Sequence, residues 1–213
     1  MASPSGRIGP GRLKTGLAVG QSRAMEENGK GLTGYWHPDY ARSLAEFGAP
    51  RELPRCRGWI LERSIPGFPH RDGMGCYPMF SCQDWGELEA DVEDLDDLIC
   101  LSLVTDPFGA YDLGYLKHCF KDACHSFKEH FVTDLSRSPE TFVSSHHRRY
   151  ARKALRTVAV EQCVEPLQFL GEWVKLYASL TQRHDINGIA AFSERAFAVQ
   201  LQIPGLIAFR AVH

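Results

Sequence analysis

The sequence lacks the features that identify several other classes of protein. No apolar run approaches the length of a membrane span, and no charged segment followed by an apolar one opens the chain as a secretory signal would. The seven cysteines are odd in number and include no C-x-x-C pair, so a disulfide framework is not expected. We therefore expect a soluble cytoplasmic protein with reduced thiols and no membrane span.

Aromatic residues are absent from the first 34 residues, which contain eight glycines. Such a segment cannot bury enough apolar surface to offset the entropy lost on ordering, so residues 1–34 are predicted to be a disordered tail. A more ordinary sequence begins at Met25, which is an alternative start to Met1. Residues 29–34 match G-x-G-x-x-G by letter, but no strand precedes them and no acidic residue follows at the required distance. We therefore expect no nucleotide site there.

Strong net charge is also absent, because the formal net charge is only −2, but the two signs are unevenly distributed. Residues 1–136 carry 14 Lys and Arg against 20 Asp and Glu, whereas residues 137–213 carry 10 against 6. An anionic ligand is therefore expected to meet the C-terminal third of the chain. Hydrophobic residues make up 44% and charged residues 23%, which is typical of a globular protein.

The periodicity and the turn residues predict an α+β protein with one mixed sheet and helices on its faces. Helices are predicted at 38–47, 84–98 (with a solvated acidic face), 111–119, from 138–140 on to about 156, 166–184 and from 193. Strands are predicted at 57–63, 98–104 (buried), 127–135, 158–164 and 206–212, with a loop at 64–78. Ser193 is expected to cap its helix, with Phe192 and Phe197 forming a hydrophobic staple.

Five cations share one face of the predicted helix around residue 150. They are Arg148, Arg149, Arg152, Lys153 and Arg156. One interpretation is that Arg149, Arg152 and Lys153 contact the phosphates of an acyl donor, a tRNA acceptor end or a lipid-linked precursor. The other is a solvated helix face that the acids of residues 84–97 partly neutralise. The sequence leaves both interpretations open.

From about Ser144 onward the chain resembles the GNAT-like acyltransferase domain of the FemAB family. The resemblance rests on the basic helix at 147–155, the strand at 157–164, the long helix from 172 to His184, and the helix and strand at 193–212. Upstream, Asp-Gly-Met-Gly-Cys-Tyr-Pro at 72–78 and Val-Thr-Asp-Pro-Phe at 104–108 are similar to N-terminal segments of bacterial relatives.

The fold implied by this resemblance is a GNAT-like mixed sheet that is incomplete at the C-terminus. An N-terminal α/β portion would occupy residues 35–136, and residues 137–213 would be the first part of the acyltransferase domain. Because that domain would need about 100 further residues, the chain resembles a truncated form, and whether it is active alone stays open.

The activity implied is transfer of an acyl or aminoacyl group from a CoA- or tRNA-linked donor to an amine. Acyl-CoA is the suspected donor and aminoacyl-tRNA the alternative, with no metal. A neutral amine attacks the activated carbonyl, a base or water chain takes its proton, and backbone N–H groups hold the oxyanion. The donor motif R/Q-x-x-G-x-G/A, which binds the pyrophosphate at a helix N-terminus, is approached only by His70-x-x-Gly73-x-Gly75.

Two residues are candidates for catalysis, and each has a structural alternative. His184, at the end of the long predicted helix, is either a general base or a C-terminal helix cap. Asp106 follows a predicted strand, where polar residues often meet substrate, but it also suits a hydrogen-bonded turn before Pro107.

The cysteines near glycine and histidine offer weaker candidates. Cys76, between Gly75 and Tyr77 in the Gly-rich loop, is a candidate for an exposed nucleophile, but no neighbour predicts a lowered pKa, so a nucleophilic role is not expected. A zinc site is suggested by His118, Cys119, Cys124 and His125 but lacks the short chelating arms of structural sites, so no metal is expected.

Two alternatives to an enzyme remain. One is a non-catalytic module that binds nucleic acid or an acidic partner through residues 146–156, although only Tyr150 could stack on bases. The other is a gene fragment without a function of its own. The oligomeric state is not indicated by the sequence.

Overall fold

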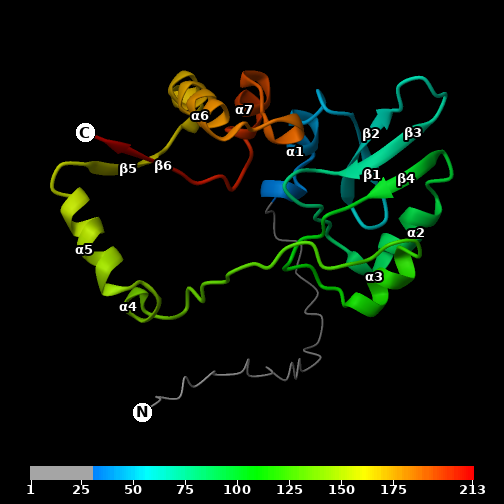
Figure 1. Ribbon diagram of the computed structural model, residues 1–213, viewed down its shortest axis with the longest axis horizontal. Coiled ribbons are helices and arrows are strands. Elements are labelled where there is room, and N and C mark those ends of the chain that lie inside the picture. The colour runs from blue at the N-terminus through cyan, green and yellow to red at the C-terminus, as the bar shows by residue number, and fades with distance from the viewer. Residues whose placement is uncertain (1–30) are drawn as a thin grey trace, which may run out of the picture. The chain divides into compact units, whose positions relative to one another are not determined.

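The computed structural model describes residues 31–213 (Figure 1). Its strands are β1 (Ala49–Leu53), β2 (Gly58–Ser64), β3 (Arg71–Gly75), β4 (Leu98–Ser102), β5 (Ala159–Cys163) and β6 (Ala208–Val212). Its α-helices are α1 (Pro38–Ser43), α2 (Leu88–Glu93), α3 (Leu113–Cys119), α4 (Pro139–Phe142), α5 (Ser145–Ala154), α6 (Leu170–His184) and α7 (Glu194–Gln200). Short 3-10 helices are η1 (Gly34–Trp36), η2 (Trp85–Glu87), η3 (Pro166–Phe169) and η4 (Gly188–Ala190).

Of the predicted tail, only residues 31–34 are among the described residues. Met25 and Gly29, the start of the glycine motif, lie outside them. Gly34 belongs to η1, and its N–H donates to the carbonyl of Pro204 at 3.1 Å. Residues 31–213 cluster as one unit, and the predicted division at residue 136 stays a prediction. None of the helices in this range is both long enough and apolar enough to cross a membrane.

The expected mixed sheet is present, with strand order β1-β2-β3-β4. The pairs β1–β2 and β2–β3 are antiparallel, and β3–β4 is parallel with a register shift between Arg71 and Gly73. The α+β class is therefore confirmed. The prediction of one sheet is wrong, because β5 and β6 pair only with each other, in antiparallel register from Ala159–Val212 to Cys163–Ala208. Alternation in sequence specifies which face of a strand is apolar but not which strand it joins.

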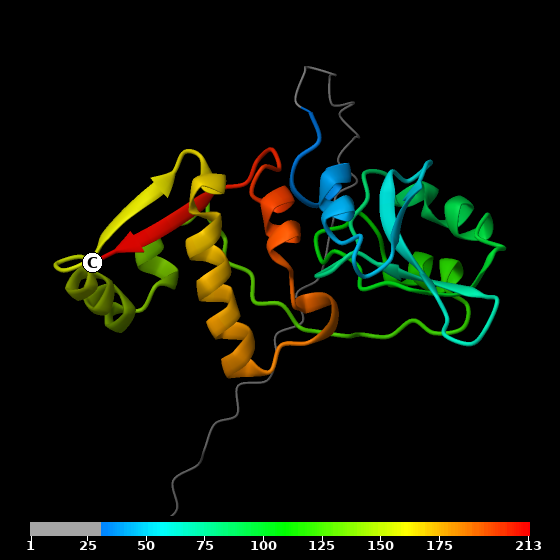
Figure 2. The same ribbon diagram turned by 90° about the horizontal axis from the view of Figure 1, so that it is seen from above.

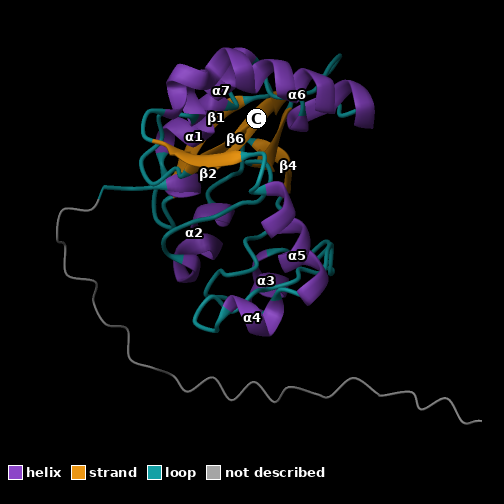
Figure 3. Cartoon of the chain, turned by 90° about the vertical axis from the view of Figure 1, so that its left-hand side faces the viewer, coloured by secondary structure: helices purple, strands orange, loops and turns teal. Residues whose placement is uncertain are grey.

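Strand β2 separates two hydrophobic cores. Ile60 and Leu61 are consecutive and fully buried, so their side chains point to opposite faces of the sheet. Ile60 packs in a cluster with Leu88 of α2 and Leu116 of α3. On the other face, Leu61 packs with Leu44, at the end of α1, and with residues near α7. Helices α1 and α2 therefore cover opposite faces of β2 (Figure 3).

Strand β3 lies within residues 64–78, which were predicted to be a loop, so that prediction is wrong. Its glycines are positions of close packing and not of a turn. A Cβ on Gly73 would lie 2.9 Å from Leu98 Cδ1, and one on Gly75 would lie 3.1 Å from Phe80 Cβ. Glycine thus permits the neighbouring side chains to approach the strand backbone.

Strand β4 was predicted to be buried but forms an edge of the sheet, where Ile99 is 60% exposed. The strand predicted at 127–135 is wrong. This segment forms no strand and runs as exposed chain between α3 and α4 (Figure 2), and Phe131 is fully exposed. The apolar residues of its alternating pattern therefore do not pack on a sheet.

Several helix starts agree with the predicted caps. Ser138 accepts the N–H of Glu140 at the predicted helix start. The prediction of one helix from there to about residue 156 is wrong, because Val143 and Ser144 are extended and divide it into α4 and α5, with Ser144 as the cap of α5. Ser193 accepts the N–H of Ala196 at 3.1 Å, and the rings of Phe192 and Phe197 lie 5.6 Å apart, as the predicted staple requires.

The helix predicted at 84–98 is shorter than expected, and its acidic face is not wholly solvated. It consists of η2 and α2 and ends at Glu93. Asp91 is 2% exposed, and its carboxylate accepts the backbone N–H groups of Arg55, at 3.1 and 3.2 Å, and of Cys56, at 2.7 Å. This carboxylate therefore fastens the β1–β2 turn to α2.

Replacing Asp91 by Ala should lower the free energy of unfolding by about 1–3 kcal/mol, because the buried N–H of Cys56 and the partly buried N–H of Arg55 would lose their acceptor. Urea denaturation of purified protein measures the change. The matched control is Asp96→Ala, an exposed position nearby, which should change stability by less than about 0.5 kcal/mol. Equal effects of the two substitutions would contradict the bridging role of Asp91.

Candidate functional site

The basic helix α5 projects its cations into solvent. Arg149, Arg152, Lys153 and Arg156 are exposed, and Arg148 is half-buried, with its Nη1 donating to the carbonyl of Glu140 at 3.0 Å. The guanidinium of Arg149 lies 5.7 Å from the centre of the ring of Tyr150. The predicted helix is therefore confirmed over Ser145–Ala154, with Arg156 in the turn that follows, and the cationic side chains are accessible to a ligand.

Several of the acids expected to neutralise this helix are paired elsewhere. Asp97 forms ion pairs with Arg51 at 2.9 Å and with Arg71 at 2.5 Å, and Asp94 pairs with Arg55 at 2.6 Å. The hydrogen bond from Arg51 lowers the pKa of Asp97. Within residues 31–213, no ion pair joins a cation of α5 to a carboxylate.

A second feature is a cavity of about 560 Å³ lined by aromatic rings, here named the aromatic pocket. Its aromatic lining residues are Tyr35 of η1, Tyr40 of α1, Tyr77 after β3, Trp173 and Tyr177 of α6, Phe192, and Phe197 of α7. Trp173 and Tyr177 are four residues apart and so lie on one face of α6. Helices α6 and α7 lie side by side (Figures 1 and 2), and α7 also packs on α1.

Most ring pairs of the aromatic pocket are edge-to-face, whereas the rings of Tyr177 and Phe192 are stacked, with centres 6.1 Å apart and an interplanar angle of 28°. The centre of the Phe197 ring lies 4.8 Å from that of Tyr177 and 5.8 Å from that of Trp173, with interplanar angles of 78° and 89°. The Tyr35 and Tyr40 rings are 4.8 Å apart at 75°. In such pairs the positive edge of one ring meets the negative face of another, which fixes the ring orientations.

Two tyrosine hydroxyls of the pocket are used by the fold. Tyr40 donates to the carbonyl of Tyr77 at 2.5 Å, and Tyr177 donates to the carbonyl of Ala190. Burial raises the pKa of Tyr40, and burial followed by the nearby Asp106 charge raises that of Tyr35. These phenols therefore remain neutral hydrogen-bond donors at physiological pH.

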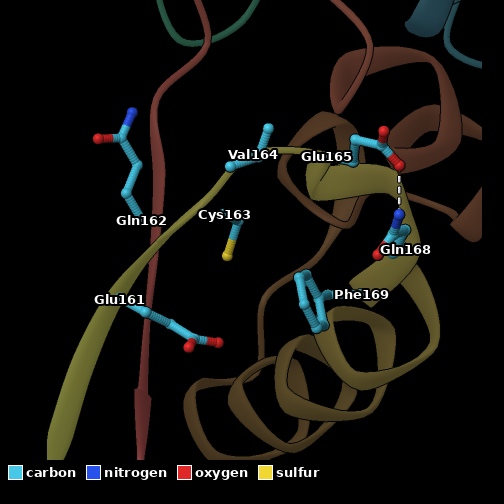
Figure 4. A pocket seen from close by; sticks show the side chains of 7 residues that line it. All are labelled: Glu161, Gln162, Cys163, Val164, Glu165, Gln168 and Phe169. Atoms are coloured by element: carbon cyan, nitrogen blue, oxygen red, sulfur yellow. Dashed lines mark hydrogen bonds between the residues drawn. The ribbon is translucent and has the colours of Figure 1, made fainter.

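A third feature is a polar cavity of about 340 Å³ between β5 and η3 (Figure 4). Its lining includes Glu161 and Glu165, and Glu165 accepts a hydrogen bond from Gln168. Arg210 of β6 pairs with Glu161, and its guanidinium lies 4.2 Å from the centre of the Phe169 ring. Two carboxylates in the wall oppose the entry of an anion.

The two catalytic candidates are not brought together with the basic helix in either cavity. His184 is exposed at the last position of α6, and Asp185 follows it in the left-handed region, closing the helix with an N–H bond to Thr181. Asp106 accepts the N–H of Phe108 at 2.9 Å, which is the hydrogen-bonded turn considered for it.

The other carboxylate oxygen of Asp106 has a structural partner. It accepts the Ser81 hydroxyl at 2.9 Å, and the Ser81 oxygen accepts the indole N–H of Trp36 at 2.7 Å. These two hydrogen bonds connect η1 to the turn after β4. A catalytic role for either His184 or Asp106 stays a prediction.

Cys76 is not the exposed nucleophile that was considered for this position. Its side chain is buried, its thiol donates to the carbonyl of Trp59 at 3.5 Å, and burial raises its pKa to about 12.

His118, one of the four residues considered for a zinc site, pairs instead with Glu89 at 2.7 Å. In the part of the chain that the structure describes, no three His, Cys, Asp or Glu side chains are grouped to hold a metal ion.

No protein-family model, curated protein or solved structure matches the chain. Function must therefore be inferred from the geometry of the sites.

The sequence predicted the basic helix α5 but not the aromatic pocket. Two features of the sequence belong to this pocket, namely the apolar stripe that contains Trp173 and Tyr177 and the staple of Phe192 with Phe197. Nothing in their spacing indicated that Tyr35 and Tyr77 lie against the same cavity.

The Cys76 thiol should resist alkylation in the native protein. Because its pKa is raised to about 12, the reactive thiolate is scarce at about pH 8, and burial blocks access. Exposed Cys100 is the internal control and should react readily. Mass-spectrometric mapping after brief treatment with iodoacetamide measures both sites, and comparable modification of Cys76 in folded protein would contradict its burial.

Proposed function

We propose that the chain is an N-acyltransferase of the FemAB and GNAT type. It would transfer an acyl or aminoacyl group from a CoA- or tRNA-linked donor to an amine. The observation that supports this proposal is the row of accessible cations on α5, which has no carboxylate partner within residues 31–213. A helix of ten residues is about 15 Å long, so its cations can contact several phosphates of one donor.

In this proposal the cations of α5 bind the donor, and binding is chiefly electrostatic. Arg149, Arg152 and Lys153 are exposed and lie within two turns of helix. Arginine offers paired N–H donors to phosphate oxygens and lysine adds a point charge. The neutral acceptor amine then attacks the donor carbonyl, and the bond from that carbonyl to the CoA sulfur or the tRNA ribose oxygen breaks. The proton lost by the amine passes to the leaving thiolate or alkoxide, with His184 or Asp106 as the candidate for this transfer.

A second candidate is a non-catalytic module that binds a polyanion through residues 146–156. It is favoured by one specific observation, namely that the cations of α5 line neither of the two cavities described above. A nucleic acid or an acidic partner could contact such a helix without entering a cavity. Against this, Tyr150 is the only aromatic residue among these cations, so stacking with bases would be limited.

Ligand binding to the purified chain separates the two candidates. Thermal unfolding is followed with and without acetyl-CoA, and binding of tRNA is titrated over a range of salt concentrations. A donor site stabilises the folded state by about 2.7 kcal/mol when acetyl-CoA is a hundredfold above its Kd. A polyanion module instead binds tRNA and single-stranded DNA of the same length equally well, with a steep salt dependence, and gains no stability from acetyl-CoA. A transferase that uses a tRNA-linked donor binds the tRNA more tightly than the DNA.

The triple variant Arg149→Ala, Arg152→Ala, Lys153→Ala tests the cations. It should abolish stabilisation by acetyl-CoA, or reduce the tRNA salt slope by about 2 to 3. The matched control is Lys175→Ala, Arg183→Ala, Arg195→Ala, which removes the same charge from exposed positions of α6 and α7. If both variants lose binding equally, only net charge matters, and if the wild type binds neither ligand, both candidates are wrong.

A further inference from the structure

We propose that the aromatic pocket is a binding site for an organic ammonium ion, held against the faces of Trp173 and Tyr177. This inference goes beyond acyl transfer and does not require it. It rests on the chemistry of the lining, the sign of the surrounding charge and the fixed orientation of the rings.

The lining offers the groups that bind ammonium ions. Half of the described residues around the cavity are aromatic, and the others are apolar, glycine or uncharged, such as Gln200. A cation over the face of an aromatic ring is attracted by the ring quadrupole, most strongly over Trp and Tyr. Trp173 is 45% exposed, so part of its surface is available to a ligand.

The charges near the pocket favour a cation. No Lys or Arg is among the described residues that line it. The carboxylate of Glu46 accepts the N–H of Ser193 at 3.3 Å, adjacent to Phe192 in the lining. Asp106 accepts a hydrogen bond from Ser81, which accepts one from Trp36 in η1, the element that contains Tyr35. Acidic groups beside an uncharged lining attract an ammonium ion and repel an anion.

The pocket is formed before a ligand enters. Phe197 is 5% exposed and packs edge-to-face with both Trp173 and Tyr177, and Tyr177 also donates a hydrogen bond to Ala190. Little conformational freedom of these rings is therefore left to lose on binding.

A ligand with an aromatic or hydroxyl group beside its ammonium fits the remaining features. The cavity of about 560 Å³ lies within the usual range of small-molecule sites. Within residues 31–213, the hydroxyls of Tyr35 and Tyr77 form no hydrogen bond and can meet a polar group of the ligand.

The test compares two probes of the same shape, (3-hydroxyphenyl)trimethylammonium and 3-tert-butylphenol, of which only the first carries a charge. Isothermal titration calorimetry on the full chain should show at least about tenfold tighter binding of the ammonium compound. Trp173→Leu should weaken its binding by about tenfold and leave that of the phenol nearly unchanged, whereas Trp173→Phe should retain most of the preference.

The control is Phe131→Leu, which removes a fully exposed ring outside the pocket and should leave both affinities unchanged. Circular dichroism confirms that each variant is folded, and the half-exposed position of Trp173 makes folding of its variants expected. Equal binding of the two probes, tighter binding of the phenol, or binding of neither by wild-type protein would overturn the proposal. So would full ammonium binding by folded Trp173→Leu.

Discussion

The burial of Ile60 and Leu61 on opposite faces of β2 is the constraint on which the described fold depends. Two consecutive residues of one strand are both removed from water, so the sheet must carry a cover on each face. Helices α2 and α3 supply one cover and α1 the other. Asp91 adds a polar fastening, because its buried carboxylate satisfies the N–H groups of the turn that leads into β2.

The aromatic pocket is a consequence of the second cover. Helix α1 is too short to protect its whole face of the sheet, and α7 packs beside it with Phe197 and Ile203 buried. Helix α6 in turn packs on α7 and presents Trp173 and Tyr177. Segments more than 100 residues apart therefore line one cavity, although Trp173 and Tyr177 are explained locally as part of an apolar stripe, and Phe192 and Phe197 as a staple.

Local signals predicted where most helices lie, although not all of their bounds, but they did not predict the partners of the strands. The serine caps, Pro38 and the cationic spacing of α5 act within one or two turns, so they can be identified without knowing the fold. Strand β3 was missed because Gly73 and Gly75 are typical of turns, whereas here they admit neighbouring side chains. The segment at 127–135 shows the converse error, since alternation alone does not provide a partner strand. The aromatic pocket and the role of Asp91 depend on tertiary contacts and could not be predicted from spacing.

The distribution of charge separates the two candidate sites. In the N-terminal half, acids and arginines compensate each other at close range, as in Arg51, Arg71 and Asp97. Those acids cannot neutralise α5 as direct partners, and exposed charges farther apart than about 8 Å are largely screened at physiological ionic strength. The cations of α5 therefore retain their attraction for anions, whereas no Lys or Arg is among the described residues that line the aromatic pocket. The acyltransferase activity that we propose would need to bind an anionic donor and an amine that is an ammonium ion in water, and the two proposed sites would divide these tasks between surfaces of different charge.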